Sequence, residues 1–142
     1  MAKIEKFEDI DAWKLARALT AKVYTFAMEG NFARDYGFRD QICRATVSIV
    51  SNIAEGFERN SGKSFLQFLA IAKGSAGEVR AQLYIAYDLG YVSREQFDEA
   101  IKDVSRISKM LSRLMAYLEE SLQPSNLQPL NLRSSARRKK SG

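Results

Sequence analysis

Apolar side chains recur every three or four positions along most of the chain, which is the spacing of one face of an α-helix. The pattern predicts four helices, at about residues 11–29, 35–59, 63–89 and 93–122. Both prolines lie beyond residue 122, and no stretch of useful length alternates with the period of two that a strand requires. The links between the segments are short. We therefore predict an all-α fold, an antiparallel up-down-up-down four-helix bundle.

Residues typical of helix ends mark the borders of these segments. Asp9 or Asp11 is the expected N-cap of the first helix, which should end near Gly30. Gly90 is expected at the C′ position of the third helix. The fourth opens with the capping-box spacing of Ser93 and Gln96. It then carries a heptad seam that predicts its buried face: Phe97, Ile101, Val104, Ser108, Leu111, Met115, Leu118 and Leu122.

The charges divide the chain into two parts. The sequence has 22 Lys and Arg against 17 Asp and Glu, a formal net charge of +5. Residues 1–122, the expected bundle domain, hold 17 groups of each sign, which argues against a continuous basic face that coats duplex DNA. Residues 123–142 form an expected disordered basic tail. Its cations are candidate nucleic-acid contacts: Arg133, Arg137, Arg138, Lys139 and Lys140.

The residue types that carry most catalysis and metal binding are scarce. The chain has no His and one Cys, Cys43, which excludes Ser-His-Asp and Cys-His catalysis and removes the usual zinc ligands. A single Cys also suits a reducing compartment. The N-terminus lacks a signal-peptide pattern, and no apolar run approaches the ~18 residues of a membrane span. We expect a cytoplasmic protein that is not an enzyme and has no cofactor, metal or small-molecule substrate.

The second predicted helix carries its polar residues in one stripe. On a helical wheel, five of them fall within an arc of about 80°, opposite the apolar face: Arg44, Ser48, Asn52, Glu55 and Arg59. One interpretation is a solvated face, which is where charged residues usually lie. The other is a contact surface for another helix, another subunit or an RNA backbone. Ser and Asn are mediocre helix formers that make specific hydrogen bonds, and Arg suits carboxylates and phosphates.

The third predicted helix has a face of small residues beside its apolar face. They are Ala70, Gly74, Gly77 and Ala81. Each interior glycine costs about 1 kcal/mol relative to alanine in an exposed helix. Small residues allow another helix to approach closely, and self-association is the simplest source of such a contact. The alternative is that the glycines only permit flexibility or a kink.

A longer pattern in the second and third helices is typical of a known family. It comprises the run QICRATVSIVSNIAEGFER from Gln41 to Arg59, the run FLAIAKGS from Phe68 to Ser75, and then Glu78, Gln82, Leu83 and Leu89-Gly90-Tyr91. Over about residues 5–120 the chain resembles the bacterial four-helix bundle proteins first noticed inside intervening sequences of large-subunit ribosomal RNA genes. Val50 stands where that family usually has Pro.

The resemblance implies a homo-oligomer, commonly a ring-like pentamer. It also implies RNA or a reverse-transcriptase-like protein as partner, because the family is similar to the accessory variability determinant of diversity-generating retroelements. Together with the polar stripe, it suggests a network between helices or between subunits formed by Arg44, Ser48, Asn52, Glu55, Arg59 and Glu78. The expected function is a non-enzymatic oligomeric scaffold that binds RNA or a nucleic-acid enzyme. The alternative is a structural, protein-binding homo-oligomer with no nucleic-acid role.

Overall fold

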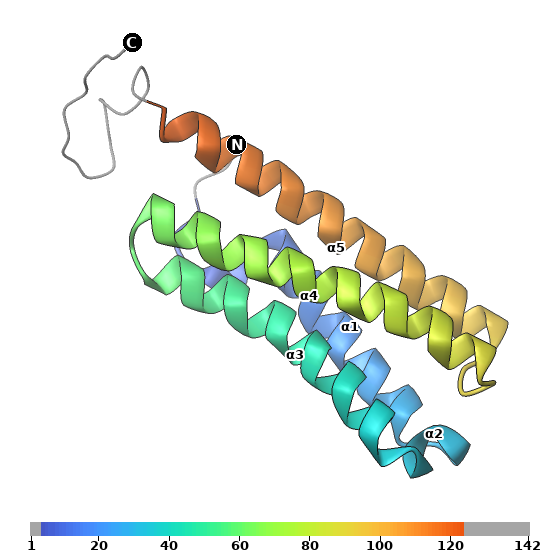
Figure 1. Ribbon diagram of the computed structural model, residues 1–142. Coiled ribbons are helices and arrows are strands. Elements are labelled where there is room, and N and C mark those ends of the chain that lie inside the picture. The colour runs from blue at the N-terminus through green and yellow to red at the C-terminus, as the bar shows by residue number, and fades with distance from the viewer. Residues whose placement is uncertain (1–3, 124–142) are drawn as a thin grey trace.

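The structure is a computed structural model that describes residues 4–123 (Figure 1). Every regular element in this range is helical, which confirms the predicted all-α class. The elements are η1 (Phe7–Asp9), a 3₁₀ turn, and the helices α1 (Asp11–Ala27), α2 (Gly30–Arg34), α3 (Tyr36–Glu58), α4 (Gly62–Asp88) and α5 (Arg94–Ser121). The borders of α3, α4 and α5 lie within two residues of those predicted. The short helix α2 is an element that the sequence pattern did not predict.

Side-chain caps fix where three of the long helices begin: Asp35 caps α3, Ser61 caps α4 and Ser93 caps α5. Asp35 accepts a hydrogen bond from the backbone N–H of Phe38 at the start of α3, with an N···O distance of 3.3 Å. At the start of α5 the predicted capping box is present. The Ser93 hydroxyl accepts from the backbone N–H of Gln96, and the Gln96 side chain accepts from the backbone N–H of Ser93. These bonds satisfy backbone donors that have no partner inside the helix.

The start of α1 differs from the prediction. Its N-cap is Ile10, which makes no side-chain cap hydrogen bond, so the predicted cap at Asp9 or Asp11 is wrong. Ile10 is buried and η1 precedes it directly, so apolar packing sets this helix start. Asp11 is instead the first helical residue, and its negative charge interacts favourably with the positive, N-terminal end of the helix dipole.

The turn after α4 contacts α2 and the start of α3 through Tyr91. Gly90 has a φ of +73°, and the next N–H, of Tyr91, donates to the carbonyl of Ala86, as predicted for a glycine that ends a helix. The Tyr91 hydroxyl then donates to Asp35 (O···O 2.7 Å), while its ring stacks on Phe32 with centroids 5.1 Å apart. The hydrogen bond to Asp35 raises the pKa of Tyr91. This contact holds α2 in place.

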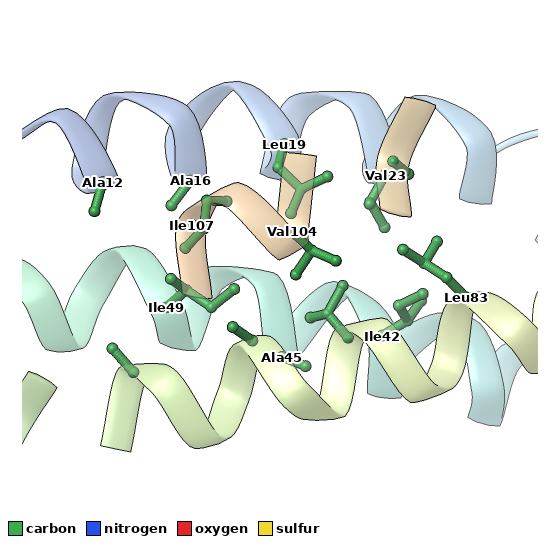
Figure 2. Packing of buried hydrophobic residues seen from close by; sticks show 14 of the residues in the cluster. Ala12, Ala16, Leu19, Val23, Ile42, Ala45, Ile49, Leu83, Val104 and Ile107 are labelled. Atoms are coloured by element: carbon green, nitrogen blue, oxygen red, sulfur yellow. The ribbon is translucent and has the colours of Figure 1, made fainter. Parts of the chain in front are cut away.

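The four long helices lie side by side around one core (Figure 1). α3 packs along α4, α4 packs along α5, and α1 contacts both α3 and α5. No helix in the described range is both long and apolar enough to cross a membrane. Figure 2 shows the interior, to which all four contribute residues such as Leu19, Val23, Ile42, Ile49, Leu83, Val104 and Ile107.

The buried face of α5 is wider than the predicted seam. The buried residues of α5 are Phe97, Ala100, Val104, Ile107, Leu111 and Leu114. The seam positions Ile101, Ser108, Met115 and Leu118 are only half-buried. The reason is that α5 packs against both α1 and α4, and a helix with two neighbours needs a broader apolar stripe than a coiled-coil seam.

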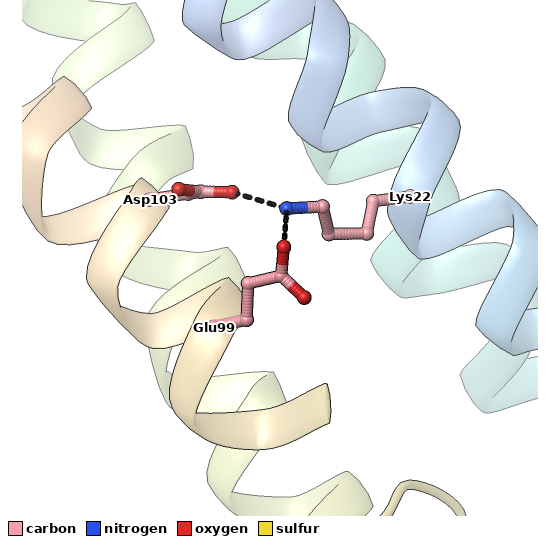
Figure 3. Close-up of polar contacts among 3 residues, drawn as sticks. All are labelled: Lys22, Glu99 and Asp103. Atoms are coloured by element: carbon pink, nitrogen blue, oxygen red, sulfur yellow. Dashed lines mark hydrogen bonds and ion pairs between the residues drawn. The ribbon is translucent and has the colours of Figure 1, made fainter. Parts of the chain in front are cut away.

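A charged cluster joins α1 to α5 (Figure 3). Lys22 Nζ lies 2.7 Å from Asp103 Oδ2 and 2.8 Å from Glu99 Oε2. Partial burial alone would lower the pKa of Lys22, but the hydrogen bonds and charges of Asp103 and Glu99 raise it above its usual 10.5. Lys22 is therefore protonated at neutral pH and stabilises the folded chain.

We expect Lys22→Gln to lower the free energy of unfolding by about 1 to 2 kcal/mol, because it leaves the half-buried Asp103 without its cation. Lys14→Gln is the control, since Lys14 is exposed and lies 3.8 Å from Asp11. Denaturant unfolding measures both. The Lys22 contribution should be complete below pH 10.5 and lost as the pH rises through the raised pKa. Equal effects of the two variants would contradict this role.

Candidate functional site

Except for Arg44, the polar stripe of α3 lies along the outer edge of the contact between α3 and α4, which we call the α3/α4 seam. At its centre Ser48 Oγ and Ser75 Oγ are 2.8 Å apart. Asn52 Nδ2 donates to Ser48 Oγ at 3.0 Å and to the Ser48 carbonyl at 2.8 Å. All three side chains are half-buried. Two helices are thus joined by hydroxyl and amide groups, which require specific geometry.

A second polar contact crosses the seam two helical turns away. Gln82 Nε2 donates to Gln41 Oε1 on α3 (3.1 Å) and to Glu78 Oε2 on its own helix (3.3 Å). Gln82 is buried, and its Oε1 has no hydrogen-bond partner among the described residues. Glu78 therefore takes part in the seam through Gln82. No ion pair of Glu78 with an arginine occurs within residues 4–123.

The far end of the seam carries an exposed ion pair. Arg59 Nη2 lies 3.1 Å from Glu55 Oε2, and both side chains are 53% exposed. The guanidinium also covers the ring of Phe68 on α4, with Cζ 4.8 Å from the ring centroid. An i,i+4 pair in solvent contributes only about 0.3–0.5 kcal/mol, so the cation–π contact is what ties this pair to α4.

Arg44 lies apart from these contacts. It is exposed and, among the described residues, makes no hydrogen bond or ion pair. It lines a surface pocket where α1 and α3 meet, together with Tyr24, Met28, Arg39, Asp40 and Cys43.

Cys43 is buried, and this burial raises the pKa of its thiol, which makes the thiol less reactive. No three His, Cys, Asp or Glu side chains within residues 4–123 gather as metal ligands would.

The small-residue face of α4 is open to solvent in the single chain. Ala70, Gly74, Gly77 and Ala81 are all exposed. A Cβ added at Gly74 or Gly77 would meet nothing within 4 Å. Large apolar side chains flank these positions: Ile71 is 51% exposed, Tyr84 48% and Ile85 47%. Within residues 4–123 no other helix approaches this face, so the predicted close contact requires a partner outside the described residues.

The predicted residues thus fall into local groups along α3 and α4. Ser48 and Asn52 share one group and Glu55 and Arg59 another, whereas Glu78 lies with Gln82 and Arg44 stands alone. Three residues that complete these contacts were not among the predicted site residues, and their only signal was a place in the family-like pattern: Gln41, Ser75 and Gln82. The predicted tail contacts lie outside the described residues: Arg133, Arg137, Arg138, Lys139 and Lys140.

The serine pair offers a direct test of the seam. We expect a double-mutant cycle of Ser48→Ala and Ser75→Ala to give a coupling free energy of about 0.5–1.5 kcal/mol, because the two hydroxyls share one half-buried hydrogen bond. Urea unfolding of the four proteins measures the coupling. The pair Ser61→Ala and Ser93→Ala is a control, because these serines cap different helices and should act additively. Additive effects at Ser48 and Ser75 would show that the hydrogen bond contributes nothing.

The fold and the seam define a class of small all-helical proteins whose long helices share one core. Residues 8–113 match the model of the 23S rRNA-intervening sequence protein family, and the chain belongs to this family. The chain is also similar to a crystal structure from Bacteroides thetaiotaomicron of a protein of unknown function in the S23 ribosomal protein family. That likeness has a TM-score of 0.67 and 25% identity, and covers 73% of this chain and 97% of the other. Among curated proteins none matches.

Proposed function

We propose that this chain is a non-enzymatic cytoplasmic scaffold that assembles with copies of itself and binds RNA or a nucleic-acid enzyme such as a reverse-transcriptase-like protein. In this proposal each subunit is an antiparallel up-down-up-down four-helix bundle, consistent with the short links between α3, α4 and α5. The observation that carries the proposal is the exposed face of α4, where small and large apolar residues lie side by side.

That face has the properties of a helix-packing surface. Ile71 and Ile85 are about half exposed, and Gly74 and Gly77 leave room between them for a close approach. Two glycines inside an exposed helix weaken it, by about 1 kcal/mol each. Packing against a partner helix offsets this loss and covers the isoleucines. A second copy of the chain is the partner we propose, and the number of five copies rests on the family resemblance.

The RNA part of the proposal rests on different support. The family description links these proteins to intervening sequences of 23S rRNA, so an RNA partner is the one we favour. The alternative is a structural homo-oligomer that binds only protein. The neutral balance of residues 1–122 favours this alternative, because a protein that coats a nucleic acid usually carries excess positive charge.

Both parts can be tested on the full chain purified from cells in low salt. Light scattering should give a mass of about five times the 16.0 kDa of one chain, and the ultraviolet spectrum should show bound nucleic acid. A mass of 16.0 kDa would overturn the assembly. A stable oligomer free of RNA would favour the purely structural alternative.

A further inference from the structure

The outward face of α5 carries a run of cations that the overall neutrality of the bundle conceals. Lys102, Arg106, Lys109 and Arg113 are separated by four, three and four positions. At ~100° per residue they fall within an arc of about 60°, and they extend over about 16 Å at 1.5 Å per residue. All four are exposed. We call this set the α5 basic stripe.

Three acidic residues beside the N-terminal end of the stripe are engaged by cations outside it, whereas Glu95 lies on the same face one heptad before Lys102, and Asp9 and Asp11 line a surface pocket together with Arg113. Asp98 pairs with Arg94 at the start of α5. Glu99 and Asp103 both bind Lys22 of α1, so their charges face the neighbouring helix (Figure 3). From residue 104 to residue 118 the helix contains no acidic residue. Within residues 4–123, no hydrogen bond or ion pair engages any cation of the stripe.

Helix stability does not explain the stripe. Cations favour the last turn of a helix, but the last turn of α5 holds no basic residue and contains Glu119 and Glu120. Solvated helix faces usually alternate the sign of their charges at i,i+4. Here the neighbours Lys102 and Arg106, and likewise Lys109 and Arg113, have the same sign, which destabilises a helix by about 0.2–0.5 kcal/mol per pair. A polyanion bound along the stripe would remove this repulsion.

The neighbouring helix adds one more cation. A depression in the surface between α1 and α5 has Lys14 and Asp11 on its α1 side and Arg106 and Met110 on its α5 side. Lys14 lies 3.8 Å from Asp11, both largely exposed, so this pair leaves the lysine available. Positive charge therefore extends from the stripe across the depression towards α1.

We propose that the α5 basic stripe binds the phosphate backbone of double-stranded RNA. This inference rests on the proposed RNA-binding function and assigns it to a surface. A straight helix that holds its cations in one line suits the regularly spaced phosphates of a duplex. The stripe has long cationic side chains and no aromatic ring between Lys102 and Arg113, so binding depends on charge and is independent of base sequence.

The test compares the full chain with two triple variants of equal net charge. The stripe variant removes three of its four cations and carries Arg106→Gln, Lys109→Gln and Arg113→Gln. The control variant removes three exposed cations elsewhere on the chain and carries Arg34→Gln, Lys63→Gln and Arg80→Gln. Fluorescence anisotropy with a labelled RNA duplex of about two helical turns is measured over a series of KCl concentrations. The stripe variant should bind at least tenfold more weakly than the control. Its slope of log affinity against log salt should be smaller by about 3, since each phosphate contact contributes about 0.9.

Each outcome separates the stripe from the wider function. If the unmodified chain binds the duplex and both variants bind it equally well, the stripe is not the site, although RNA binding stands. If the unmodified chain binds no duplex, the stripe proposal fails, and the RNA part of the proposed function fails with it only if the chain also binds no single-stranded RNA. Tighter binding of poly-glutamate than of RNA would assign the stripe to an acidic protein and overturn the proposal. Circular dichroism and light scattering show whether the variants keep the fold and mass of the unmodified chain.

Discussion

Gly56→Ala is expected to lower the free energy of unfolding by about 2 kcal/mol. Gly56 is buried in the contact between α3 and α4, and an added Cβ would lie 2.6 Å from the Cβ of Phe68 and 3.1 Å from the ring of Phe65. The first contact involves the base of a side chain, which cannot move unless the backbone shifts. Overpacking of this kind costs up to about 3 kcal/mol, and the better helix propensity of alanine offsets about 1 kcal/mol.

The matched control for this substitution is Gly37→Ala in the same helix. A Cβ at Gly37 meets nothing within 4 Å, so the change should leave stability unaltered or raise it slightly. Thermal and urea unfolding measure both variants. If Gly56→Ala is as stable as the unmodified chain, the close contact between α3 and α4 does not exist as described.

Gly74→Leu combined with Gly77→Leu is expected to break the proposed assembly into smaller species. Both positions have open space in the single chain, so leucine does not disturb the subunit itself. In an assembly that packs a second helix against this face, the added side chains would force the helices apart. A cost of about 2 to 3 kcal/mol per contact lowers the association constant by roughly 30- to 150-fold, and in a symmetric assembly every interface carries the change.

Light scattering over a dilution series measures this loss directly. Gly37→Leu serves as the control, because Gly37 is also exposed with open space around it but lies on α3, away from the small-residue face. The control should keep the mass of the unmodified chain. A Gly74→Leu, Gly77→Leu protein that keeps the original mass would exclude this face of α4 from the interface.

Much of the fold was predictable because the signals that place helix ends are local. Gly90 and the Ser93–Gln96 capping box each act within about five residues, and the structure has them where the sequence placed them. The helix α2 escaped prediction for the opposite reason. It is held by Phe32 stacked on Tyr91, a residue that is distant in sequence. The five residues of α2 are too few to show a helical periodicity, and their sequence does not reveal the contact between Phe32 and Tyr91.

The candidate site was predictable in its position on α3 but not in its partners. The helical wheel placed the five polar residues on one face, and four of them contact α4 or one another. Which side chains meet depends on how α3 and α4 are staggered, and one sequence does not encode this stagger in any local pattern. Arg44 therefore lies beside Tyr24 and Cys43, in the pocket between α1 and α3, without an ion pair to Glu78 in the described chain.

The distribution of charge on α5 was also not predictable from the overall charge balance. Equal numbers of acidic and basic groups in residues 1–122 argue against a continuous basic face that coats duplex DNA. That balance is an average over all faces of the molecule. Lys22 binds Glu99 and Asp103, so these two acidic groups of α5 face α1, while the cations of the α5 basic stripe stay exposed. A neutral helical domain therefore contains one surface with the charge that RNA binding requires.

Ultraviolet crosslinking in living cells tests the proposed function most directly. The full chain is crosslinked, purified under native conditions and separated by size, and the RNA in each fraction is quantified. The proposal predicts crosslinked RNA in fractions whose mass is a multiple of 16.0 kDa, and much less of it when Arg106, Lys109 and Arg113 are replaced by glutamine. An assembly of the same mass that carries no crosslinked RNA would contradict the proposed RNA-binding scaffold.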